Sequence, residues 1–168
     1  PLEALRCPRC GNKCEGVTEV CPMCNFRFSE IALYNPKHFV WLAMLLGFLV
    51  PVYMSAVNWG RVGRSRLKRA WLVGGILGSL GVILGFFALG ELMGGETIES
   101  NLDLRTLGKL SGYAINLPIG IYLRKKQLAL FKAGQQLGMR KASGVKGVFS
   151  GIGLVVVVIV VAIVIAVL

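Results

Sequence analysis

Long apolar runs constrain the fold of this chain more than any other feature. Three of them reach the ~20 residues that a helix needs to span a bilayer, and residues 107–123 form a fourth, weaker run. Of the 168 residues, 55% are hydrophobic and only 16% are charged, against about 25% charged in soluble domains. We therefore predict an all-α membrane protein with three or four transmembrane helices, over residues 39–59, 71–93, 107–123 and 148–168 of a domain spanning 39–168.

The first apolar run has a tryptophan near each end and a proline in its middle. Trp41 and Trp59 are eighteen residues apart, about 27 Å along a helix, which matches the two aromatic belts of a membrane. Pro51 should kink this helix. A re-entrant hairpin is the alternative, and the tryptophan spacing argues against it.

Glycines form a stripe along the second run. Residues 74, 78, 81 and 85 are all glycine, at a spacing that places them on one face of a helix. Small residues of this kind let two membrane helices approach closely. We expect the stripe to pack within the helical bundle or against a partner helix.

Basic residues gather next to the apolar runs. The net charge is +11, and of the 19 Lys and Arg residues, five lie in Arg61–Arg69 and seven in Arg124–Lys146. Cytoplasmic loops of membrane proteins carry such an excess, so we expect no nucleic-acid partner, although basic charge alone would allow one. Residues 127–146 alternate apolar and basic side chains, which predicts an amphipathic helix on the membrane surface.

Two Cys-x-x-Cys knuckles open the chain. Cys7 and Cys10 form the first, and Cys21 and Cys24 form the second after a gap of ten residues. Four thiolates around one ion leave no open ligand position, which predicts a structural Zn²⁺ rather than a catalytic one. Metal binding would supply the folding energy of this short domain, which we place at residues 1–30, before a linker at 31–38.

The residues around the knuckles predict their local structure. Gly11 and Asn25 suit the left-handed conformation after each turn, and residues 16–20 and 26–28 suit a minimal β-hairpin. An iron site of the rubredoxin kind uses similar knuckles but needs a larger core. Disulfides are the other alternative, and five cysteines leave one unpaired; Cys14 is either a spare or a substitute for Cys10.

Residues 5–28 resemble the short four-Cys zinc ribbons that open many bacterial and archaeal membrane proteins. Beyond them, Pro51 and the pattern Asn58-Trp59-x-Arg61-x-Gly63-Arg64 are similar to a pattern in small multi-pass prokaryotic membrane proteins that carry such ribbons. The resemblance implies no reaction. It implies that the ribbon is a docking or stabilising module.

The side of the membrane on which the cysteine-rich head lies is ambiguous. The basic segments should be cytoplasmic and the acidic residues 91–103 external, so four crossings would place the head outside. Free thiols that bind metal fit the reducing cytosol, and no signal peptide precedes the first run. We expect a cytoplasmic head, with a Pro51 segment that does not cross and three crossings in total.

Catalytic residues are not recognisable in this pattern. The single histidine, His38, lies where the head meets the first run, and serines in the runs lack a histidine partner at membrane depth. We predict a non-catalytic accessory or scaffold subunit of the inner or plasma membrane, in contact with lipid and other membrane subunits as a homo- or hetero-oligomer. The alternative is a small transporter or channel component, with Pro51 and Pro118 breaking helices around a site.

Overall fold

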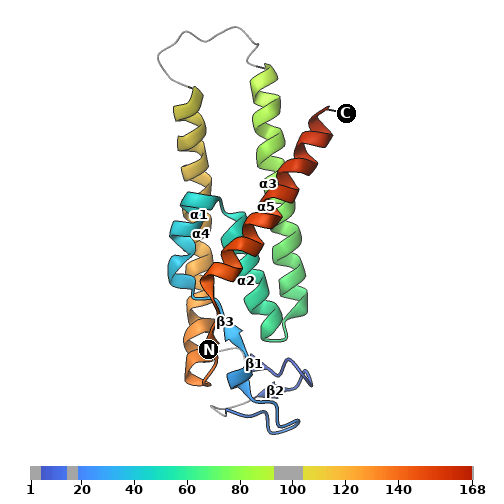
Figure 1. Cartoon of the computed structure of the whole chain (residues 1–168), viewed down its shortest axis with the longest axis vertical. Helices are drawn as coiled ribbons and strands as arrows, with labels where there is room; N and C mark the ends of the chain where they lie inside the picture. Colours follow the sequence, from blue (N-terminus) through green and yellow to red (C-terminus); the bar gives the residue numbers. More distant parts are fainter. Residues whose placement is uncertain (1–4, 15–18, 93–103, 168) are drawn as a thin grey trace.

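A computed structural model describes residues 5–14, 19–92 and 104–167, and this part of the chain is mostly helical (Figure 1). A small head, formed by the cysteine-rich segment, lies at one end of the molecule, and the helices extend away from it. The helices in the described ranges are α1 (Phe39–Leu46), α2 (Leu49–Arg61), α3 (Ser65–Leu92), α4 (Leu104–Gln136) and α5 (Gly144–Val167).

Short strands and 3₁₀ turns make up the rest of the regular structure. In the head, β1 (Leu5–Arg6) pairs antiparallel with β2 (Lys13–Cys14). Next to it, β3 (Ala32–Leu33) pairs parallel with β4 (Arg140–Lys141), so that the segment before α1 is bonded to the segment after α4. The 3₁₀ turns η1 (Phe28–Glu30) and η2 (Pro36–His38) flank β3.

Residues 39–59 form a helical hairpin, where the sequence suggested one kinked helix. Helix α1 ends at Leu46, Gly47 adopts a φ of 80°, and α2 then begins at Leu49 and runs back toward the head (Figure 1). A φ in this range favours glycine, which has no Cβ to clash. Pro51 lies in the first turn of α2, where a backbone N–H has no helical partner to lose, so the proline does not kink the helix.

The turn of this hairpin is held by a side chain from α4. The Oδ1 atom of Asn116 accepts a hydrogen bond of 3.0 Å from the backbone N–H of Phe48, the residue that precedes α2. Asn116 therefore satisfies a backbone group that the turn at Gly47 leaves without a helical partner. Helix α4 continues through Pro118 unbroken.

The hairpin is the centre around which α3, α4 and α5 pack, and a glycine of each long helix makes the close approach. A Cβ added to any of these glycines would press on the hairpin, and in two cases on its backbone. On Gly75 of α3, the added Cβ would lie 2.6 Å from the Val52 side chain. On Gly120 of α4, it would lie 3.0 Å from the Ala43 Cβ and 3.1 Å from the Val40 Cα. On Gly151 of α5, it would lie 3.0 Å from the Val50 side chain and 3.2 Å from the Val50 Cα.

The expected glycine stripe of the second run does not make this contact. A Cβ on Gly74, Gly81 or Gly85 would meet no described atom within 4 Å, and one on Gly78 would reach only the Phe48 ring, at 3.8 Å. Helix α3 therefore faces the hairpin through Gly75, about 100° around the helix from its neighbour Gly74. The stripe is left on the outer surface of the bundle.

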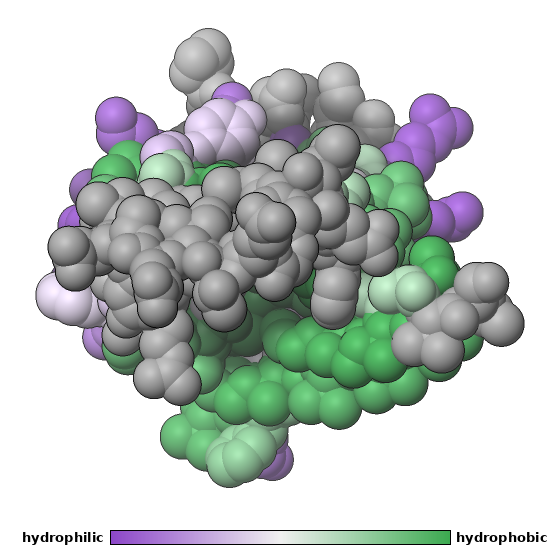
Figure 2. Space-filling model, turned by 90° about the horizontal axis from the view of Figure 1, so that it is seen from above, coloured by the Kyte–Doolittle hydropathy of each residue, from purple (hydrophilic) through white to green (hydrophobic). Residues whose placement is uncertain are grey.

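Two helices of the described ranges are long and apolar enough to cross a membrane. They comprise residues 65–85 of α3 and 144–166 of α5. Helix α4 has 33 residues but mixes polar with apolar side chains and does not meet the same standard. Figure 2 shows the rod of α5 covered with hydrophobic side chains, and apart from the buried Val158 the valines and isoleucines from 156 to 165 are 41–58% exposed. Such a surface matches a helix that faces lipid.

The hairpin places both basic segments at the same end as the head. Residues 61–69 join α2 to α3 beside the head, and residues 124–146 include the end of α4 and the start of α5, also at that end (Figure 1). The acidic residues 93–103 lie outside the described residues.

Candidate metal centre

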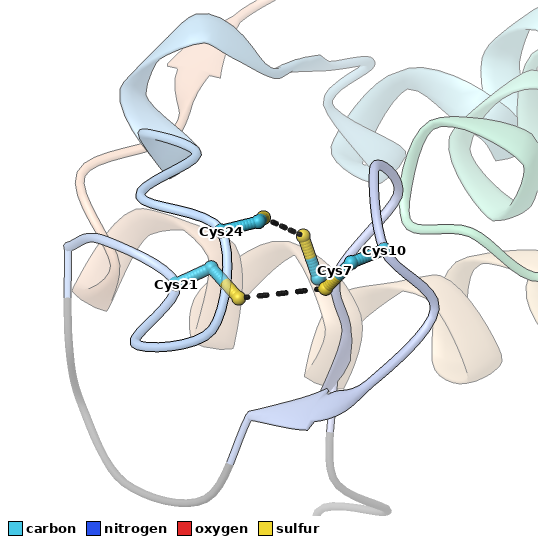
Figure 3. Close-up of side chains that lie close together, drawn as sticks. All are labelled: Cys7, Cys10, Cys21 and Cys24. Carbon is cyan, nitrogen blue, oxygen red and sulfur yellow. Dashed lines mark hydrogen bonds between the residues drawn. The ribbon is translucent and has the colours of Figure 1, made fainter.

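The four predicted ligands come together between the two knuckles (Figure 3). The Sγ atoms of Cys7, Cys10, Cys21 and Cys24 all lie within 4.8 Å of one another. The Cys7 and Cys24 sulfurs are 3.5 Å apart, and those of Cys10 and Cys21 are 3.8 Å apart. A tetrahedral ion with bonds of about 2.3 Å to sulfur requires S···S edges of about 3.8 Å, so the cluster fits Zn²⁺. These distances are far from the ~2.05 Å of a disulfide.

Both knuckles fold by the same backbone pattern. In each, the first cysteine's N–H donates to a carbonyl five residues on, and its own carbonyl accepts from the N–H four residues on. The residue that donates this second bond has a left-handed φ, 76° at Gly11 and 55° at Asn25, as expected. The four bonds are all 2.9 Å: Cys7 to Asn12, Gly11 to Cys7, Cys21 to Phe26 and Asn25 to Cys21.

Of the β-hairpin expected across residues 16–20 and 26–28, the described residues include an antiparallel bridge between Val20 and Arg27. The β1–β2 pair closes the first knuckle. Residues 15–18 lie outside the described residues. Cys14 ends β2.

The ionisation of Cys21 and that of Cys24 are in conflict, because the neighbouring thiols favour the thiolate of Cys21 and disfavour that of Cys24. Burial disfavours the charged form of Cys21, but N–H groups of Met23 and Cys24 and the thiols of Cys24 and Cys7 donate to its sulfur, and together they lower its pKa to about 6. Burial and the three neighbouring cysteines raise the pKa of Cys24 to about 12. A divalent cation removes this conflict, because it stabilises all four thiolates at once.

The cluster is part of an apolar core that the head shares with the helices. Cys7 and Cys21 are fully buried, while Cys10 is exposed. The core continues from these two sulfurs into the ends of α2 and α4. Its remaining buried members are Phe28, Ile31, Leu33, Val62, Leu130, Phe131, Leu137 and Met139.

The segment 127–146 does not form a separate amphipathic helix. Its first part continues α4 as far as Gln136, and the buried apolar residues of that part, Leu130 and Phe131, pack on the head. Residues 140–142 then pair with the segment before α1, through bonds of 2.8 Å from Arg140 N–H to the Ile31 carbonyl and from Ala142 N–H to the Leu33 carbonyl. The alternation of apolar and basic residues therefore reflects a helix whose apolar face packs on the head.

The residues of the Asn-Trp-x-Arg-x-Gly-Arg pattern fasten the segment after the head to α2. Asn58 accepts from the Tyr34 N–H at 2.8 Å and donates to the Tyr34 carbonyl at 3.1 Å. The Arg61 guanidinium donates to the Ala32 carbonyl and lies 4.7 Å from the centre of the Tyr34 ring. Gly63, with a φ of 77°, ends α2, and Arg64 stacks on Trp59 at 5.1 Å.

A buried polar network extends from Asn58 to α4. The Asn58 amide donates to Gln127 Oε1 at 3.2 Å, and the Gln127 amide donates to Ser55 Oγ at 2.7 Å. All three side chains are at most 1% exposed. Gln127 was not singled out from the sequence, but its spacing from the apolar Leu123 and Leu130 is that of a single helix face and could have indicated it. His38, in contrast, is exposed.

Comparison of the whole chain with protein-family models, with curated proteins and with solved structures found no match.

Proposed function

We propose that this protein is a non-catalytic, multi-pass accessory or scaffold subunit of the cell membrane, and that its head is a zinc ribbon that docks partner subunits. The observation that carries this proposal is the core that the cysteines share with α2 and α4. A head packed in this way presents its outer knuckles in a fixed orientation to the membrane helices. A bound Zn²⁺ would hold the four thiolates and leave no ligand position open for substrate.

The head would lie on the cytoplasmic side. The hairpin α1–α2 then acts as a re-entrant loop, and α3, α4 and α5 supply three crossings. This topology places both basic segments in the cytoplasm, as the positive-inside rule requires, and keeps the thiols in a reducing compartment. Non-helical backbone at membrane depth is tolerated where protein surrounds it, and the turn at Gly47 meets Asn116 of α4.

The outer tip of the second knuckle is the proposed docking surface. Pro22 is exposed and Met23 is 71% exposed, an unusual position for an apolar side chain beside a metal cluster. We expect Met23→Asp to keep one zinc per chain and to lose subunits that co-purify with the native protein. Ser143→Asp, an exposed position at the same end of the molecule, is the matched control. A native chain that purifies as a monomer with no associated subunit would refute the scaffold function.

A transporter or channel component is the second candidate, and the broken first span favours it. The turn of the hairpin, Ser79 of α3 and Asn116 of α4 border a pocket of about 160 Å³ together with α5. Transporter sites are built around such interrupted helices near the bilayer midplane. Solute or ion flux into proteoliposomes, abolished by Asn116→Leu in a chain that still binds zinc, would favour this candidate.

A further inference from the structure

An apolar groove runs between α3 and α4, away from the metal centre. Its volume is about 520 Å³, within the ~300–1,000 Å³ of small-molecule sites. The walls are formed by Trp71, Gly74 and Gly78 of α3 and by Ile115 and Ile119 of α4, and Phe48 of the hairpin turn contributes to the floor. The glycines keep the groove open, because a Cβ on Gly74 would meet no described atom within 4 Å.

The end of the groove nearest the head has a different chemistry. Trp71 of α3 and Tyr122 of α4 meet there with ring centroids 6.1 Å apart, and both line the groove. Aromatic pairs of this type favour the depth at which hydrocarbon gives way to headgroups. The aromatic pair therefore marks the boundary between the apolar groove and the basic end of the molecule.

A lysine from each wall lies one turn beyond this aromatic pair. Lys126 follows Tyr122 by four residues, and its Nζ lies 5.7 Å from the centre of the Tyr122 ring. Lys68 precedes Trp71 by three residues and packs its stem over Gly60 of α2, where an added Cβ would lie 2.7 Å from the Lys68 Cδ. Both lysines are exposed. Because residues three and four apart are neighbours on a helix surface, Lys68 lies beside Trp71 and Lys126 beside Tyr122, at the head end of the groove.

We propose that this groove binds one acyl chain of an anionic phospholipid, with the lipid phosphate held between Lys68 and Lys126. The occupant follows from the order of chemistry along the groove: apolar walls, an aromatic boundary, then two cations on the basic side of the molecule. Anionic headgroups are attracted to such juxtamembrane cations, whereas an apolar partner helix would gain nothing from them. This inference rests on membrane placement alone and is independent of any docking by the head.

The headgroup half of the proposal is tested by native mass spectrometry of the full chain in mild detergent. The chain is titrated with palmitoyl-oleoyl phosphatidylglycerol or with phosphatidylcholine of the same chains. We expect one phosphatidylglycerol to be retained, and the double variant Lys68→Gln/Lys126→Gln to weaken its retention roughly 30-fold. The neighbouring pair Arg69→Gln/Lys125→Gln removes the same charge from adjacent exposed positions and should leave retention within about twofold. Equal retention of phosphatidylcholine, or equal loss in both double variants, would overturn the proposal.

The acyl-chain half is tested by filling the groove. Gly74→Leu places a side chain in the groove, while Gly81→Leu adds the same side chain on α3 at a glycine that does not line it. We expect Gly74→Leu to abolish lipid retention and Gly81→Leu to preserve it, with unchanged zinc content in both. Retention by Gly74→Leu would overturn the proposal. So would a dimer of the native chain that Gly74→Leu dissociates without a change in bound lipid, because the occupant would then be a second copy.

Discussion

The cysteines of the cluster act as a set, and one substitution is expected to remove the metal. Cys21 is fully buried and its sulfur lies 3.8 Å from that of Cys10. We predict that Cys21→Ser lowers the zinc content from one per chain to near zero by elemental analysis, because three thiolates leave the tetrahedral shell open. Cys14→Ser should retain one zinc. Loss of zinc in Cys14→Ser with retention in Cys10→Ser would show that Cys14 is the fourth ligand.

Gln127 is the residue whose loss should most disturb the polar network between α2 and α4. Removing its amide leaves Ser55 and Asn58 buried with fewer partners, and unsatisfied buried groups cost about 1–3 kcal/mol each. We predict that Gln127→Ala lowers the free energy of unfolding by this amount, measured by denaturant titration in micelles. Gln136→Ala, on an exposed face of the same helix, should change it by less than about 0.5 kcal/mol. Equal effects would show that the network contributes nothing specific.

At the scale of elements, the packing of α3 on the hairpin distinguishes two adjacent glycines. A Cβ on Gly75 would lie 2.6 Å from Val52, a buried β-branched side chain with little freedom to move, whereas one on Gly74 meets no described atom within 4 Å. We predict that Gly75→Ala destabilises the bundle by about 1–3 kcal/mol through overpacking, while Gly74→Ala has no cost. The same denaturant titration measures both. A destabilised Gly74→Ala would instead locate the helix contact on the stripe at residues 74–85.

Elements whose geometry is set within a few residues are predictable from this sequence. The knuckles are one case, since the cysteine spacing and the left-handed Gly11 and Asn25 bring two thiolates together locally. Helices α3 and α5 are another, because residues 71–93 and 148–168 are almost entirely apolar. In both cases the information lies inside the segment itself.

Elements fixed by distant contacts are not predictable in this way. Trp41 and Trp59 are spaced as well for two half-helices as for one span, and the choice depends on Gly47 and on Asn116, which lies 68 residues from its partner Phe48. The stripe of glycines in the second run satisfies a packing pattern, but Gly75 is the residue that contacts the hairpin. The apolar alternation after residue 127 likewise could not distinguish a membrane surface from the head as the covering partner.

For the whole molecule, the hairpin predicts that the head and both basic segments lie on the same side of the membrane, which thiol labelling can test. With Cys14→Ser as background, Lys37→Cys, Arg66→Cys and Lys132→Cys place exposed thiols in the head-proximal segment and in each basic segment. We predict that an impermeant thiol reagent labels all three only after permeabilisation, and labels Ser100→Cys, between α3 and α4, in intact cells. Labelling of Lys37→Cys in intact cells would show that the first apolar run crosses the membrane.

Zinc is expected to stabilise the joint between head and helices as well as the head itself. Cys7 and Cys21 share one apolar core with Ile31 and Leu33. The carbonyls of Ile31 and Leu33 accept hydrogen bonds of 2.8 Å from the N–H groups of Arg140 and Ala142, in and just after β4. Loss of the metal loosens the head side of this core, so the N–H groups that donate these bonds should open more often. We predict that chelation raises hydrogen exchange there about tenfold or more, equal to ~1.4 kcal/mol of local opening.

The amides to follow are those of Arg140 and Ala142, and the control is the amide of Val158 in the middle of α5, which is buried away from the head. Exchange at Val158 should be unchanged, because α5 packs on the hairpin through Gly151 rather than on the cysteines. Unchanged exchange at Arg140 and Ala142 after verified zinc removal would mean that head and bundle are separate units. The head could then not present its knuckles in a fixed orientation, and the proposed docking role would lose its structural basis.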